Sequence, residues 1–180
     1  MARPTIARPQ PNEYVPAVSH YMARVPDGDV LDLLTHQIDE TLGLVSGLSE
    51  QEADFAYAPG KWSIKEVIGH LSDTERVLSY RAVAFARGEP QSLPGFDENL
   101  YVANANFRTR TLADLMAELR AVRASTVALF ASLDPAMLDR RGTANNREYT
   151  VRALASFIAG HERHHAAIFR ERYLPALRAG

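Results

Sequence analysis

The chain has 180 residues, a length typical of one domain, and a domain of this size folds without needing a metal or a disulfide. Its net charge of −2 at pH 7 supplies no field that would concentrate it on phosphate backbones, so we expect no nucleic-acid partner. The absence of cysteine excludes disulfides, thiolate metal ligands and a catalytic thiol.

No apolar run approaches the roughly 20 residues that a membrane helix requires, so no membrane partner is expected. Residues 1–12 lack the apolar core of a signal peptide, which predicts a cytoplasmic protein. The first 28 residues are rich in proline. Proline forbids a long helix, and this segment is therefore predicted to be an extended arm lying over the rest of the chain.

Helical periodicity begins after the arm, and it predicts a first helix over about 29–48. A second helix is expected to begin at Ser63, because Ser63 and Glu66 have the spacing of a capping box, and to end near Gly88. A long connection over about 88–110 follows, and connections of this length are usually functional or mobile.

The second half of the chain contains two further helical patterns. Thr111 and Thr150 are the expected N-caps of a third helix, to about 133, and a fourth, to about 174. Residues 141–149 are predicted to be a polar loop, with room for a brief hairpin over 144–150. The predicted fold is therefore all-α: a single four-helix bundle with a long crossover loop over residues 29–176, preceded by the arm over 1–28.

Two histidines interrupt the apolar stripe of the fourth helix at positions where its periodicity demands leucine. His161 and His165 are one turn apart, so both rings can converge on one point inside the bundle. A divalent cation would satisfy one nitrogen of each ring, and the alternative is a hydrogen-bonded pair of core histidines. A third ligand is expected from another helix, and the candidate is His70, at the edge of the second helix's stripe.

Residues 161–165 also match the short HExxH pattern of zinc proteases, in which the glutamate, here Glu162, is the general base. The longer metzincin pattern would require glycine and histidine at the third and sixth positions beyond His165. The chain has Ile168 and Glu171 there, which argues against a protease.

Several segments carry a resemblance to a known family. They read YMARVP at 21–26, PGKWSIKE at 59–66, VIGHL at 67–71, DTER at 73–76, LPGFD at 93–97 and GHE at 160–162 leading to His165. The segment at 21–26 lies at the entry to the predicted first helix. In order and spacing these segments resemble the DinB superfamily, also called YfiT-like metalloenzymes, over residues 20–174. The resemblance implies a four-helix bundle, often a homodimer, in which His70, His161 and His165 hold zinc or nickel, with iron or manganese as alternatives.

The resemblance also implies a choice of reactions, since relatives include enzymes that couple a low-molecular-weight thiol to an electrophile and others described as metal-dependent hydrolases. Three neutral histidines leave a metal with an open coordination position, as in catalytic sites. The first hypothesis is a thiol-dependent S-transferase, in which the metal activates a small external thiol that attacks a small-molecule substrate. The alternatives are a metal-dependent hydrolase that uses water and a non-catalytic metal-binding bundle.

Other polar and aromatic residues are candidates for the surroundings of this site. Asp73 follows His70 by about one turn and Glu162 is next to His161, so either carboxylate is a candidate to orient a ring or relay a proton. The candidates for the substrate pocket and its lid are Trp62, Asp97 and Tyr101.

Overall fold

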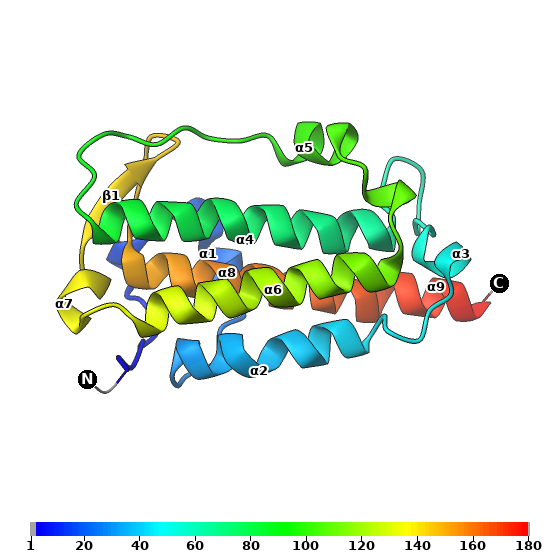
Figure 1. Ribbon diagram of the computed structural model, residues 1–180, viewed down its shortest axis with the longest axis horizontal. Coiled ribbons are helices and arrows are strands. Elements are labelled where there is room, and N and C mark those ends of the chain that lie inside the picture. The colour runs from blue at the N-terminus through cyan, green and yellow to red at the C-terminus, as the bar shows by residue number, and fades with distance from the viewer. Residues whose placement is uncertain (1–2, 180) are drawn as a thin grey trace.

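The computed structural model describes residues 3–179, and its main body consists of four long helices that lie side by side (Figure 1). These helices are α2 (Val30–Gly43), α4 (Ile64–Ala86), α6 (Leu112–Ala131) and α8 (Val151–Ile168). Both α2 and α4 pack against α6 and α8, so the four helices form a closed ring around a shared interior. The predicted all-α four-helix bundle is confirmed.

The long helices begin at the caps that the sequence predicts. The Ser63 hydroxyl accepts a hydrogen bond from the Glu66 N–H, and the Glu66 carboxylate accepts one from the Ser63 N–H at 2.7 Å. Thr111 and Thr150 cap α6 and α8 through their hydroxyl groups. After α4, Gly88 has a φ of +82°, a left-handed conformation that favours glycine and ends the helix.

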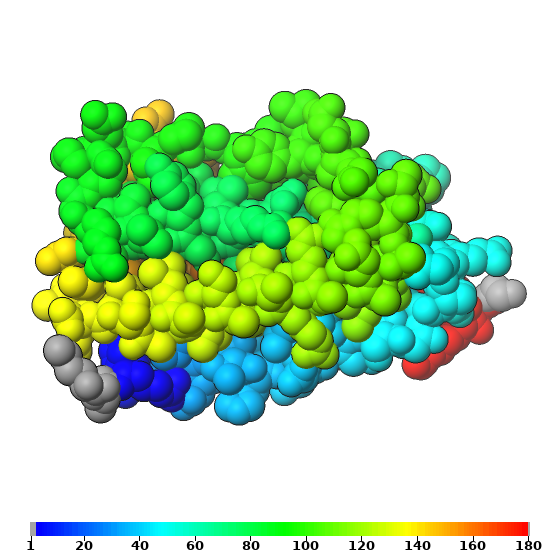
Figure 2. Space-filling model, in the orientation of Figure 1, coloured from blue at the N-terminus to red at the C-terminus, as the bar shows by residue number. Residues whose placement is uncertain are grey.

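The connection between α4 and α6 is long because both helices point in the same direction (Figure 1). A helix of 23 residues is about 34 Å long, so the chain must return along the whole bundle before α6 begins. The connection contains α5 (Glu98–Asn104) and the 3-10 turn η3 (Phe107–Thr109), where the sequence predicts only a loop. Figure 2 shows this segment, in green, along one long edge of the molecule.

The N-terminal segment contains short helical turns where the sequence predicts an extended arm. They are η1 (Pro11–Glu13), η2 (Pro16–Val18) and α1 (Ser19–Met22). Proline occupies the first position of both 3-10 turns, where its missing N–H costs nothing. Helix α1 packs against α8, and Ile6, Val18 and Met22 are buried, so the segment covers part of the bundle.

A two-stranded antiparallel hairpin closes one end of the bundle. It pairs β1 (Arg141–Ala144) with β2 (Arg147–Thr150), in the segment that the sequence predicts as a polar loop with room for a brief hairpin. Asn145 and Asn146 form the turn with φ values of 51° and 56°, as a two-residue hairpin loop requires. Leu93 of the crossover bridges to Ala144, which ties the crossover to the hairpin.

The last helix is longer than the predicted end near residue 174. After α8 the chain forms a π-helical turn, η4 (Phe169–Tyr173), and continues as α9 (Leu174–Ala179). Pro175 has no N–H to donate to the carbonyl of residue 171, which lies in this widened turn. The remaining short helices, α3 (Glu50–Ala53) and α7 (Pro135–Leu138), lie in connections.

A layer of buried polar side chains crosses the middle of the bundle between two hydrophobic clusters. Leu78 and Leu154 belong to the cluster on one side, and Leu71 and Phe169 to the cluster on the other. Between them every long helix contributes polar groups: Gln37 from α2, His70, Thr74 and Glu75 from α4, Arg123 and Thr126 from α6, and His161, Glu162 and His165 from α8. Because buried polar groups are costly unless paired, this layer requires a specific arrangement of partners.

Candidate metal centre

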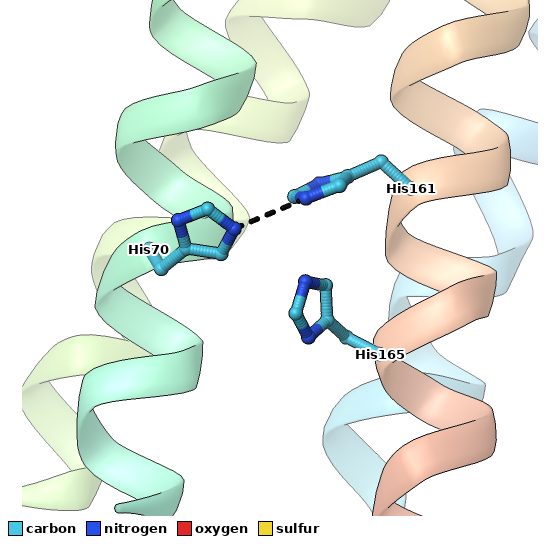
Figure 3. A group of neighbouring side chains, drawn as sticks. All are labelled: His70, His161 and His165. Atoms are coloured by element: carbon cyan, nitrogen blue, oxygen red, sulfur yellow. Dashed lines mark hydrogen bonds between the residues drawn. The ribbon is translucent and has the colours of Figure 1, made fainter. Parts of the chain in front are cut away.

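Three histidines from two helices meet within this polar layer. His70 comes from α4, while His161 and His165 come from α8. One ring nitrogen of each lies within 4.8 Å of the others, and the Nε2 atoms of His70 and His161 are 3.1 Å apart. Figure 3 shows the rings turned toward one another between the two helices. The structure therefore brings together the three histidines that the sequence singles out.

Burial keeps all three rings neutral at neutral pH. It lowers the pKa of His70 to about 4. Burial, and then the neighbouring histidines, lower the pKa values of His161 and His165 well below their ordinary value. Neutral imidazole is the form in which histidine binds a metal.

The donor set fits a divalent cation such as zinc or nickel, which imidazole nitrogens bind well. The buried Nδ1 of His165 has no hydrogen-bond partner among the described residues. Hydrogen bonding among the described residues therefore leaves this nitrogen of His165 unsatisfied. A cation held by His70, His161 and His165 would be bonded to a nitrogen of each ring.

Thr74 is the neighbour of His70 within α4. Its hydroxyl lies 3.4 Å from Nδ1 of His70, one turn away. A partner at Nδ1 helps to fix the tautomer and the orientation of the ring, while Nε2 faces His161. In the sequence, the only signal of this role is the four-residue spacing of Thr74 from His70.

Aromatic side chains flank the histidine cluster. The ring centroid of Trp62 lies 4.6 Å from that of His70, so Trp62 is in the predicted pocket. The ring centroid of Tyr21, from α1, lies 5.3 Å from that of His161 and 5.2 Å from that of Phe157. The sequence does not indicate that Tyr21 and Phe157 lie at the site, because no local pattern shows that α1 packs on α8.

A cavity of about 370 Å³ adjoins the histidine cluster, a volume within the range of small-molecule sites. Its walls come from the N-terminal segment, α4, α8, the crossover and the hairpin. Besides the three histidines, its charged and titratable lining residues are His20, Tyr21, Arg81, Glu98, Arg147, Tyr149 and His164. The cavity therefore gives a small molecule room beside the three rings.

Glu162 does not line this cavity, although it is next to His161 in the sequence. Its Oε2 accepts a hydrogen bond from Nη2 of Arg123 at 2.7 Å and another from Gln37. The carboxylate is thus held in the bundle interior and makes no hydrogen bond to a histidine among the described residues. The protease arrangement, with Glu162 as the general base, is not what the structure shows.

Arg123 connects Glu162 to a second buried carboxylate. Its Nε and Nη2 donate to the two oxygens of Glu75, each at 2.8 Å, and its Nη1 donates to the Leu34 carbonyl at 3.0 Å. Two carboxylates share one guanidinium, which leaves excess negative charge beside His161. Such a charge favours a cation held by neutral ligands. The sequence does not reveal this network, because its members come from four helices.

The other predicted site residues lie away from the cavity. An oxygen of Asp73 is 3.5 Å from Nη1 of Arg76, and burial raises the pKa of the Asp73 carboxyl. Asp97 caps α5 by accepting hydrogen bonds from two backbone N–H groups, which turns its carboxylate to that helix. Tyr101 is half-exposed, with its ring centroid 5.3 Å from that of Phe96. In that segment Phe96 and Glu98 line the cavity instead.

Comparison with known proteins agrees with this fold. Residues 33–169 match the sequence model of the DinB superfamily. The chain belongs to the DinB superfamily. Among curated relatives of this DinB protein, a "putative metal-dependent hydrolase" of Oceanobacillus iheyensis is 24% identical over 140 residues, which cover 76% of this chain and 78% of that protein.

A solved structure shows the same fold at low sequence identity. YfiT from Bacillus subtilis, described as "a probable metal-dependent hydrolase with an unusual four-helix bundle topology", superposes with a TM-score of 0.71 and 18% identity. The match covers 79% of this chain and 82% of YfiT. The likeness to YfiT supports the four-helix bundle fold of this DinB protein.

The fold does not test the predicted partners or the predicted location of the protein. A homodimer, the lack of a nucleic-acid partner and a cytoplasmic location stay predictions. Over residues 3–179, no helix combines the length and the apolar character needed to cross a membrane.

Proposed function

We propose that this DinB protein is a metal-dependent S-transferase, in which a small external thiol is coupled to an electrophilic small molecule in the cavity. His70, His161 and His165 would hold the divalent cation. The observation that carries the proposal is the convergence of three neutral imidazoles at the wall of a cavity large enough for a guest. When bound, a divalent cation with an open position supplies Lewis acidity that deprotonates a thiol and acidifies water.

The residues around the histidines favour a thiol over water as the nucleophile. Hydrolysis draws on a general base for the water and a general acid for the leaving group. The carboxylate in the HExxH position, Glu162, is instead held by Arg123 and Gln37. Glu98 is the one carboxylate among the residues that line the cavity in the described part of the chain. A thiol bound to a metal would be acidic enough to lose its proton to solvent water without a carboxylate base, and it must come from outside because the chain has no cysteine.

The chain's own residues would position and shield the reacting groups. Trp62 and Tyr21 flank the cluster and reduce the access of water, which strengthens electrostatic interactions there. Thr74 holds the ring of His70, and the buried pair of Arg123 and Glu162 holds α6 against α8. These contacts keep the histidines in place on rigid helices.

Hydrolysis is the second candidate, and the printed descriptions of both relatives favour it. It would use the same three histidines and the same cavity, with water in place of the thiol. The two candidates differ in one requirement, since only the transferase consumes a thiol.

The experiment that separates them compares reactions with and without a thiol. The metal-loaded protein is incubated with 1-chloro-2,4-dinitrobenzene and a panel of small thiols including cysteine and glutathione, and separately with p-nitrophenyl acetate and no thiol. We expect conjugate formation above the uncatalysed rate that is lost in His70→Ala. The matched control is His36→Ala, because His36 is exposed on α2 and bonds only the Asp32 carbonyl among the described residues.

Two other outcomes would contradict the transferase proposal. Ester hydrolysis that depends on His70, without thiol conjugation, would establish the hydrolase. Metal binding with neither reaction would support the alternative of a non-catalytic metal-binding bundle.

A further inference from the structure

Arg81 is a buried cation in the cavity wall. Among the described residues, three lysine and arginine side chains are deeply buried, namely Lys65, Arg81 and Arg123. Lys65 and Arg123 each contact two carboxylates within 3.2 Å. Arg81 is only 6% exposed, yet it forms no ion pair with any residue from 3 to 179 within 4.0 Å. It is therefore the buried cation whose charge the described chain does not neutralise.

The contacts of Arg81 use a small part of its hydrogen-bonding capacity. Its Nη2 donates to the Pro94 carbonyl at 3.0 Å, and its guanidinium carbon lies 5.9 Å from the ring centroid of Phe96. A guanidinium has five N–H donors in a planar fork. The hydrogen bond to Pro94 holds the crossover against α4. It uses one of the five donors, and it does not require the positive charge of the guanidinium.

Arg81 and His70 lie on one face of α4 and line the same cavity. They are eleven residues apart, which is about three turns and about 16 Å along the helix axis. Glu98, the one carboxylate among the described residues that line the cavity, forms no ion pair with Arg81. The three histidines thus lie toward one end of the described lining and Arg81 toward the other.

An isolated buried charge is unfavourable unless a partner of opposite charge reaches it. Burial lowers the pKa of Arg81, which reflects this cost. Carboxylates and phosphates present paired oxygens that match the guanidinium fork. Arg147 also lines the cavity but is exposed, so water already solvates its charge.

We propose that Arg81 binds an oxyanion group, a carboxylate or a phosphate, of the small molecule that enters the cavity. The ligand would be an elongated molecule with its anion at Arg81 and its reacting group near the histidines. The role of that molecule as a substrate rests on the proposed function, whereas the anion site itself does not.

The test uses the full-length protein without metal, so that anion binding is measured apart from catalysis. The probes are inorganic phosphate, succinate and the neutral succinamide, and binding is followed by NMR through the Nε–Hε resonance of Arg81 and the backbone amides around it. The variants are Arg81→Gln and Arg81→Lys. The control is Arg120→Gln, which removes one exposed charge that pairs with Asp39 on the bundle surface.

We expect phosphate or succinate to bind the wild type and Arg120→Gln equally, and Arg81→Gln about tenfold more weakly or worse. Whichever anion binds more tightly identifies the oxyanion class. Succinamide should not bind. Arg81→Lys keeps the charge without the fork, so we expect intermediate affinity.

Three results would overturn the proposal: equal affinity in the wild type and Arg81→Gln, equal affinity for succinate and succinamide, or no anion binding by the wild type. Thermal unfolding shows whether each variant folds. If Arg81→Gln does not fold, the affinity of Arg81→Lys is compared with that of the wild type instead. A separate zinc titration of the wild type tests the histidine cluster. Its failure would refute the proposed function and leave the anion site standing.

Discussion

The Nε2 atoms of His70 and His161 lie 3.1 Å apart, although 91 positions separate the two residues in the sequence. Each ring is carried by a long helix whose first turn is capped, by Ser63 in α4 and by Thr150 in α8. The caps set where each helix begins, and the packing of α4 on α8 sets how the rings meet. The candidate metal centre is therefore built on rigid elements rather than on loops.

The metal-free protein is expected to lose stability as the pH falls below about 6.5. Burial lowers the folded-state pKa of His70 to about 4, and those of His161 and His165 well below 6.5. Below pH 6.5 the unfolded chain therefore binds more protons than the folded one, so acidification favours unfolding. Each histidine contributes up to about 1.4 kcal/mol per pH unit within this window.

Urea unfolding at about pH 7 and about pH 5 measures this effect. We expect His70→Gln to lose less free energy of unfolding than the wild type between the two conditions. An equal or larger loss in the variant would show that His70 is not held neutral by burial.

Gly160 allows α1 to approach α8 closely, next to His161. A Cβ at this position would lie 2.2 Å from the carbonyl oxygen of Tyr21, so α1 would have to move. We expect Gly160→Ala to lower the free energy of unfolding by about 1–3 kcal/mol, as overpacking does. Tyr21 would also shift from its place over His161, which NMR detects.

Gly43→Ala in α2 is the matched control, since a Cβ there meets nothing within 4 Å. We expect this change to be neutral or to stabilise the protein by about 0.4–1 kcal/mol. Equal stabilities of the two alanine variants would contradict the close approach of α1.

Arg123 neutralises two buried carboxylates, and its removal should be strongly destabilising. We expect Arg123→Met to cost about 3–5 kcal/mol, because Glu75 and Glu162 would remain buried without their partner. Converting both glutamates to glutamine in the same protein should restore much of the loss. Chemical denaturation measures all three proteins. A single variant that loses less than about 1 kcal/mol would show that the network is solvated and contributes little.

Thr74 is expected to support metal binding through His70. Thr74→Val keeps the shape of the side chain and removes the hydroxyl that lies 3.4 Å from Nδ1 of His70. We expect about tenfold weaker zinc binding, the usual cost of losing a partner of a histidine ligand. The control is Thr126→Val, because Thr126 is also buried but bonds the Val122 carbonyl and Ser79. Similar zinc affinities in both variants would exclude a role for the Thr74 hydroxyl.

The features that the sequence predicts are those encoded within a few residues. The caps at Ser63 and Thr150 and the apolar periods predict the four helices, and His161 and His165 are recognisable because they interrupt a leucine stripe. Helical periodicity does not indicate which helices pack against one another. For that reason the partners of Arg123 and the isolation of Arg81 emerge only from the packed bundle.

Loop residues were the least predictable part of the site. Asp97 and Tyr101 were candidates only because the crossover is long, and length does not indicate where a side chain points. The aspartate caps α5 instead, since a helix within the crossover needs an acceptor for its first N–H groups. Its neighbours Phe96 and Glu98 line the cavity.

The most direct measurement is a calorimetric titration of the metal-free protein with zinc and with nickel, combined with elemental analysis. We expect a single ion per chain in the wild type and in His36→Ala. We expect that ion to be lost in His70→Ala, His161→Ala and His165→Ala, while circular dichroism shows each variant to be folded. Stoichiometric binding that survives in all three variants, or no binding by the wild type, would contradict a metal centre at these histidines.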